Sequence, residues 1–324
     1  MKKITKLLML SFVGLSADNA NANANANANA NANANANANA NANANANANA
    51  NAVYTVEKDI LFKAVEAREI KLDLYLPKTE AKVDGKYPLL VWVHGGAWKR
   101  GTKDDIPTKN PLLLNSVLDE GYALAAVDYR LSGEATFPKP VADINDAINY
   151  LHGHANKYNL AADNVVMMGR SAGGHLAGLV GASNTHGDIS FYSEPKYRVA
   201  GVVSFFGPTD LLELGNKGNR PTSKKSSVSR FLGDIPSEVP DLAAQASTTS
   251  YINSDAPPYI QFHGTLDKRV PLAQSQILKD VLDKYGIENK LFIEEGVGHS
   301  APIFDTDKYV PHVIAFLERR YPIK

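Results

Sequence analysis

Three side chains whose types together perform acyl transfer lie far apart in the sequence: Ser171, Asp267 and His299. Ser171 is the central residue of 169–173, GRSAG, a G-x-S-x-G pattern typical of a sharp turn between a strand and a helix. A serine hydroxyl becomes a good nucleophile when an imidazole takes its proton, and a carboxylate fixes the tautomer of that imidazole. The order Ser, Asp, His is the one expected when such residues follow successive strands of one sheet. We therefore predict that Ser171 is the nucleophile, His299 the base and Asp267 the orienting acid.

Other titratable residues are alternatives for these roles. Asp210 also follows a predicted strand, so it stays open as a second choice for the acid. His94 and His263 lie inside strand-end motifs, where we expect them to orient loops rather than to act as the base. Asp128, in the DYR segment 128–130, is expected to anchor its loop through an ion pair.

A glycine-rich segment, HGGAW at 94–98, can supply the backbone donors that acyl transfer needs. Donors must approach the oxygen that becomes negative, and one such donor lowers the barrier by about 2.7–4 kcal/mol. We predict an oxyanion hole made of the N–H groups of Gly96, Ala97 and Ala172. Ala97 can serve if its backbone conformation is ordinary for a residue with a side chain. The alternative is a simple glycine turn after a strand.

The elements that must position these residues alternate along the chain. Segments 60–62 and 70–76 predict an antiparallel pair, because the second alternates apolar and polar residues. Continuous apolar runs typical of strands buried on both faces follow at 89–93, 123–127, 165–168, 200–205, 259–262 and 290–293. Apolar residues at helical spacing predict helices over 141–151, 277–285 and 310–321, and 175–180 reads as a helix after Ser171.

This alternation predicts an α/β fold with a mostly parallel central sheet of about eight strands and helices on both faces. Functional sites in such sheets lie at the carboxyl ends of the strands. The predicted nucleophile, base, acid and oxyanion donors all follow strands, so they are expected to share one edge.

Composition excludes several other classes of site. The 324 residues contain 34 basic and 34 acidic side chains and no cysteine. A net charge of zero gives no broad attraction to nucleic acid or to an anionic membrane, so we expect neither as a partner. The acyl-transfer residues instead indicate an ester-bearing small molecule as substrate. Without cysteine the chain has no disulfide, no cysteine-ligated metal and no thiol nucleophile. We predict no metal site and no cofactor.

The first 52 residues are set apart from the rest. Residues 1–17 join three lysines to a short apolar run, which predicts a signal peptide and a secreted or periplasmic protein; an ordinary basic terminus is the alternative. Residues 18–52 contain 17 Asn-Ala pairs, which cannot bury enough apolar surface to order themselves and read as a spacer. Residues 53–324 form the predicted catalytic domain, with an insertion at about 213–254 that either lines the pocket or forms a solvated excursion.

Four side chains near these motifs are candidates for contact with the substrate. Trp98, Phe206 and Phe231 are each either part of an aromatic wall or part of the core. Arg170, beside the nucleophile, either senses an anionic substrate or braces a loop.

The chain resembles the α/β-hydrolase superfamily, and within it the H-G-G esterases of the bifunctional feruloyl and acetyl-xylan esterase type. The resemblance rests on residues 94–98, 128–131, 169–177 and 207–211, completed by Asp267 and His299. Ala97 departs from it, since many relatives have a third glycine there. The resemblance implies a serine carboxylesterase that cleaves acetyl or feruloyl esters on plant polysaccharide. An amidase or formamidase of the same fold is the alternative, followed by a binding protein without catalysis, which would normally have lost one of the three residues.

Overall fold

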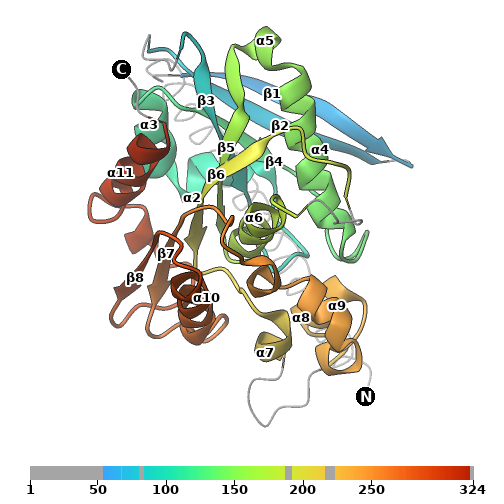
Figure 1. Ribbon diagram of the computed structural model, residues 1–324. Coiled ribbons are helices and arrows are strands. Elements are labelled where there is room, and N and C mark those ends of the chain that lie inside the picture. The colour runs from blue at the N-terminus through green and yellow to red at the C-terminus, as the bar shows by residue number, and fades with distance from the viewer. Residues whose placement is uncertain (1–53, 67, 80–83, 187–191, 216–222, 322–324) are drawn as a thin grey trace, which may run out of the picture. The chain divides into compact units, whose positions relative to one another are not determined.

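An eight-stranded, mostly parallel sheet organises the part of the chain that the structure describes (Figure 1). This computed structural model describes residues 54–66, 68–79, 84–186, 192–215 and 223–321. These ranges fall within one unit, Val53–Lys324. The predicted signal peptide, residues 1–17, and the predicted spacer, 18–52, lie outside the described residues.

The strands follow the order β1-β2-β4-β3-β5-β6-β7-β8. The β1/β2 and β2/β4 pairs are antiparallel and every later pair is parallel, which confirms the predicted opening pair and the mostly parallel sheet. Their bounds are β1 Tyr54–Val65, β2 Arg68–Pro77, β3 Tyr87–Val93, β4 Ala123–Val127, β5 Leu160–Arg170, β6 Arg198–Phe205, β7 Tyr259–Gly264 and β8 Asn289–Glu294.

Apolar side chains on the two faces of the sheet form two separate core clusters. In β3, for example, Leu89, Val91 and Val93 join one cluster, whereas Leu90 and Trp92 join the other. This period-two division explains the continuous apolar runs, because both faces of each central strand are covered.

Helices cover both faces. The first cluster packs against α4 (Lys139–Gly153), α6 (Ala172–Ser183) and α10 (Ala273–Lys284), and the second against α3 (Pro111–Asp119) and α11 (Val310–Arg320). The remaining helical elements are short: η1 Lys103–Asp105, α2 Ile106–Lys109, α5 Ala155–Tyr158, α7 Leu211–Gly215, α8 Ser227–Leu232, η2 Pro236–Glu238, α9 Pro240–Gln245, η3 Thr248–Tyr251 and η4 Pro302–Phe304. None of the described helices has the length and apolar character needed to cross a membrane.

Two differences from the sequence-based prediction concern helices near the site. The helix α6 begins directly after Ser171, three residues earlier than predicted, and every one of its residues is buried. The predicted insertion is largely helical where it is described, with α8, η2, α9 and η3 following one another; residues 216–222 lie outside the described part.

Candidate active site

The turn that carries Ser171 connects β5 directly to α6. Ser171 has φ 53° and ψ −121°, a conformation that costs a residue with a side chain about 1–3 kcal/mol. Two backbone hydrogen bonds hold it there: Ser171 N–H donates to Phe205 O (2.8 Å), and Ser171 O accepts from His175 N–H (3.0 Å). The strained turn lifts the hydroxyl away from the sheet at the first residue before the helix.

The two glycines of the turn lie against other backbone. A Cβ on Gly169 would come within 2.3 Å of Gly173 O, and a Cβ on Gly173 within 2.0 Å of Val93 O. Neither distance leaves room for a side chain, which agrees with the steric reason for the glycines in the G-x-S-x-G pattern. The second contact also joins the nucleophile turn to the end of β3.

The structure brings Ser171, His299 and Asp267 together. His299 Nε2 lies 2.9 Å from Ser171 Oγ, and His299 Nδ1 lies 2.6 Å from Asp267 Oδ2. Residues 171 and 299 are 128 positions apart in sequence, so it is the parallel order of β5, β6, β7 and β8 that places them at one edge. The His299 side chain is only 8% exposed, yet its Nε2 reaches the serine. This is the hydrogen-bonded chain that an activated serine requires.

Asp267 is held as a carboxylate. Its Oδ1 accepts from the N–H groups of Arg269 and Val270, each at 2.9 Å, which leaves Oδ2 for His299. Burial alone would raise the pKa of this carboxyl, but hydrogen bonds from His263, His299 and Val270 outweigh burial and hold its pKa well below the usual range. A permanent negative charge beside His299 favours the imidazolium that forms when the serine is deprotonated.

The other titratable candidates make no described contact with Ser171 or with the His299 ring. Asp210 Oδ1 accepts from Glu213 N–H (2.9 Å) and so caps α7. His263 lies beneath the Asp267 loop, with Nε2 2.8 Å from Val270 O and Nδ1 2.7 Å from Ser275 Oγ, as expected for a loop-orienting residue.

The predicted oxyanion donors line the same cavity as Ser171 and His299. Gly96, Ala97 and Trp98 have φ angles of 121°, 56° and 57° in succession, so Ala97 does not have the ordinary backbone on which its donor role was conditional. Its N–H group nevertheless meets no acceptor among the described residues. This run of positive φ turns the chain sharply, and Lys99 N–H closes the turn on Gly96 O (3.2 Å). Among the described residues no acceptor takes the N–H of Gly96, Ala97 or Ala172, so all three donors are free to meet an oxygen in the cavity.

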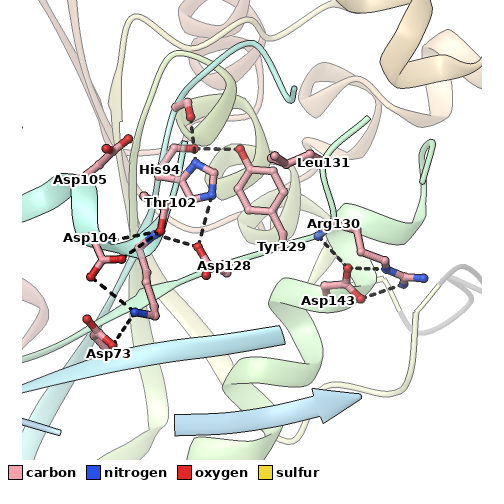
Figure 2. A network of polar contacts seen from close by, with 12 residues as sticks. Asp73, His94, Thr102, Asp104, Asp105, Asp128, Tyr129, Arg130, Leu131 and Asp143 are labelled. Atoms are coloured by element: carbon pink, nitrogen blue, oxygen red, sulfur yellow. Dashed lines mark hydrogen bonds and ion pairs between the residues drawn. The ribbon is translucent and has the colours of Figure 1, made fainter. Parts of the chain in front are cut away.

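His94 supports this turn from behind. Its ring stacks on Tyr129 with centroids 4.3 Å apart, its Nδ1 lies 2.8 Å from Gly95 O, and its carbonyl accepts from the Tyr129 hydroxyl (2.9 Å) (Figure 2). Burial lowers the pKa of His94 and raises that of Asp128, 3.8 Å away. His94 therefore orients the loop, as predicted, in an environment that favours its neutral form.

Asp128 differs from its predicted role as half of an ion pair. Its Oδ1 accepts from Lys103 N–H (2.7 Å), so it fixes the loop through backbone. The arginine of the same segment, Arg130, instead makes a two-point contact with Asp143, whose side chain is fully buried (Figure 2). Asp143 lies 13 positions from Arg130 in the sequence. No rule of sequence spacing indicates that Arg130 pairs with Asp143 rather than with Asp128.

The aromatic side chains divide between the two alternatives. Trp98 lines the cavity but is 3% exposed, stacks on Phe231 (5.0 Å) and donates its Nε1–H to His175 Nδ1 (3.1 Å). Phe206, one of the candidates for substrate contact, is 1% exposed and lies edge-on against His299 at 4.8 Å, which favours the core alternative. It therefore supports the imidazole from the interior and does not form a pocket wall.

The cavity has a volume of about 1040 Å³. The insertion contributes Leu214, Ser227 and Val228 to its lining, which favours the pocket-lining alternative for this segment. Arg170 also lines the cavity, and its Nη1 donates to Lys109 O (3.1 Å) and Asn110 Oδ1 (2.8 Å), which agrees with the loop-bracing alternative. The contribution of residues 99–110 was not predicted, because they follow a glycine turn with no strand or periodic helix to place them.

Comparison with known proteins finds a matching family model and solved structures of esterases. The BD-FAE family model matches residues 72–282, a range that includes Ser171 and Asp267 and ends before His299. A solved structure described as a truncated form of carbohydrate esterase from gut microbiota is 27% identical, with a TM-score of 0.73, and the alignment covers 83% of this chain and 98% of that one. A bifunctional GH43-CE protein of Bacteroides eggerthii is 28% identical with a TM-score of 0.71, over 82% of this chain and 38% of its own.

Curated relatives are also named as esterases, and the match covers a smaller share of their length. Esterase LipQ of Mycobacterium tuberculosis is 27% identical over 238 residues, which is 72% of this chain and 54% of that protein. The chain spans about half the length of the curated relatives it matches. The predicted α/β-hydrolase fold is confirmed by the sheet and by the solved structures, and the family model covers well over half of the sequence. The chain belongs to the BD-FAE family of α/β-hydrolase esterases.

Proposed function

We propose that this protein is a serine carboxylesterase that works through an acyl-enzyme. The observation that carries the proposal is the continuous hydrogen-bonded chain from Ser171 Oγ through His299 to Asp267, next to three free backbone N–H groups. Metal ions and organic cofactors have no part in the proposed reaction.

The first half of the reaction forms the acyl-enzyme. Ser171 Oγ attacks the ester carbonyl while His299 Nε2 takes its proton, and the negative oxygen is stabilised by the N–H groups of Gly96, Ala97 and Ala172. His299 then passes the proton to the departing alcohol. Asp267 stays ionised throughout and stabilises the imidazolium.

The second half releases the acid. A water molecule gives a proton to His299 and attacks the acyl carbonyl, and the returning proton restores Ser171. One ester and one water thus yield one acid and one alcohol. The insertion residues Leu214 and Val228 offer apolar surface to the acyl or alcohol group.

We propose acyl esters carried by polysaccharide, acetyl or feruloyl, as the substrate class. Support comes from two solved relatives described as carbohydrate esterase and as GH43-CE, together with a cavity of about 1040 Å³ that admits more than a small ester. We also propose that the protein is exported, on the basis of the lysines and apolar run in residues 1–17.

The test combines labelling with turnover. A fluorophosphonate should label the wild type at Ser171 and leave Ser171→Ala unlabelled, because the serine hydroxyl is the proposed nucleophile. Release of acetate from acetylated xylan and of ferulate from a feruloylated oligosaccharide should exceed hydrolysis of formamides. An unlabelled wild type would contradict the esterase proposal, and a preference for formamides would replace it with an amidase.

A further inference from the structure

The cavity next to Ser171 is lined by an excess of cationic residues. Its five basic residues are Lys99, Arg100, Lys109, Arg170 and Arg269. Asp105 is the single acidic residue among the described residues that line it, and it is already paired with Lys109 at 2.6 Å. Residues 53–324 have an overall net charge of −2, so the positive charge is local to this cavity. A cleft lined by one sign of charge attracts ligands of the opposite sign.

Arg170 is the most firmly placed of these cations. It directly precedes Ser171 and is half-buried, and burial lowers the pKa of its guanidinium. Its Nη1 donates to Lys109 O and Asn110 Oδ1, both uncharged acceptors. The guanidinium also lies 5.2 Å from the centre of the Phe206 ring, which packs on His299. Phe206 therefore contacts both the Arg170 guanidinium and the His299 imidazole.

No carboxylate in the described part of the chain comes within ion-pair distance of Arg170. The acids that influence it most act from farther away: Asp105 is paired with Lys109, and Asp305 accepts from Leu112 N–H and Leu113 N–H. No described residue accepts from Arg170 Nε or Nη2. A half-buried guanidinium with unused donors binds a carboxylate well, because the planar fork matches two carboxylate oxygens.

The remaining cations extend this charge around the cavity. Lys99, Arg100 and Arg269 are exposed, and none of the three forms a salt bridge with another described residue. Arg100 follows the oxyanion turn, and Arg269 donates its N–H to Asp267 Oδ1. The positive side chains thus come from the segments that carry the oxyanion donors, the nucleophile and the acid.

We propose that this site selects esters that carry a carboxylate close to the scissile bond, held by Arg170 and attracted by the surrounding cations. The inference rests on the proposed esterase function and narrows its substrate class. The carboxylate can belong to the alcohol part, as in an acylated acidic sugar, or to the acyl part, as in the monoester of a dicarboxylic acid. Both sources present the same anionic group to the same guanidinium.

Matched substrate pairs test the charge alone. For the alcohol side, the pair is 4-acetoxybenzoate and 4-acetoxybenzamide; for the acyl side, it is mono-4-nitrophenyl adipate and the corresponding 4-nitrophenyl adipamate. Each kcat/KM is divided by the rate of hydroxide-catalysed hydrolysis, so that the ratio reports recognition by the enzyme. We expect the carboxylate to be favoured by about tenfold in at least one pair, equivalent to about 1.4 kcal/mol. The ratio should fall towards one as NaCl rises from low to high concentration.

Variants locate the effect. Arg170→Gln and the double variant Arg100→Gln/Arg269→Gln should each lower the carboxylate-to-amide ratio by about threefold or more. Arg198→Gln is the matched control, because Arg198 is exposed at the start of β6, the opposite end from the site. It removes the same charge and should leave the ratio unchanged.

The outcomes separate this inference from the proposed function. Hydrolysis of the neutral amide esters with a ratio of one or less in both pairs would overturn the carboxylate preference and leave the esterase proposal standing. A ratio above one that survives both arginine variants would overturn the assigned site. Absence of both hydrolysis and fluorophosphonate labelling would refute the esterase proposal itself.

Discussion

Replacing Asp267 by asparagine should almost abolish turnover while preserving the fold. The N–H groups of Arg269 and Val270 both donate to Asp267 Oδ1, so an asparagine must keep its oxygen at that position. Its NH₂ group then replaces Oδ2, 2.6 Å from His299 Nδ1. A donor in that place selects the imidazole tautomer with the proton on Nε2, which cannot accept the proton of Ser171. We expect kcat to fall about 10³–10⁴-fold, equivalent to about 4–5.5 kcal/mol of barrier.

The assay for Asp267→Asn is steady-state hydrolysis of 4-nitrophenyl acetate, with thermal unfolding to verify the fold. Asp210→Asn is the matched control, because an asparagine there keeps the oxygen that caps α7 and no described contact joins Asp210 to His299. The control should retain activity within about threefold. If Asp267→Asn stayed within about tenfold of the wild type while Asp210→Asn lost activity, the acid would be wrongly assigned.

Three further predictions concern stability. Gly173→Ala should lower the free energy of unfolding by about 3 kcal/mol, because its Cβ would meet Val93 O at 2.0 Å, whereas Gly153→Ala, with open space around it, should raise it by about 0.5–1 kcal/mol; urea unfolding distinguishes the two. Burial lowers the pKa of His175 to about 4, so this imidazole becomes protonated near pH 6.5 in the unfolded chain but stays neutral in the folded chain until the pH is much lower. Between pH 7 and pH 5 the free energy of unfolding of the wild type should therefore fall by about 2 kcal/mol more than that of His175→Gln. Equal pH dependence of the free energy of unfolding in the two proteins would contradict this. Ala97→Gly should raise the free energy of unfolding by about 0.5–1 kcal/mol by relieving the positive φ of 56°; a lower melting temperature would show that Ala97 is not strained.

The sheet was predictable because both faces of its central strands are buried. The run at 123–127 matches β4 residue for residue, and the other strands differ mainly at their ends, where exposed residues such as Arg198 continue the ladder. Helix α3 was not predicted. It begins at Pro111 within a segment whose apolar residues 112–114 are consecutive, so helical periodicity is hidden.

The catalytic residues could be predicted because they belong to short sequence motifs that follow strands. The three residues follow strands of one sheet: Ser171 follows β5, Asp267 follows β7 and His299 follows β8. Because these strands are parallel and lie near one another, the three residues come together at one edge of the sheet. The two alternatives for Phe206 stayed open because a strand-end position alone does not say whether a ring points into the cavity or under the imidazole. The cationic lining was missed for a similar reason, since Arg100 and Arg269 come together only through loops.

The backbone contact of Gly173 with Val93 has a consequence for how this enzyme can change over evolutionary time. Gly173, two residues after Ser171, lies so close to the main chain of Val93 at the end of β3 that no side chain fits between them, so the packing of these two segments depends on the backbone and not on the choice of side chains. The cavity wall, in contrast, is assembled from side chains of loops and short helices such as Val228 and Arg269. Substitutions in the cavity lining can therefore change which ester fits, while the backbone that positions Ser171 stays the same.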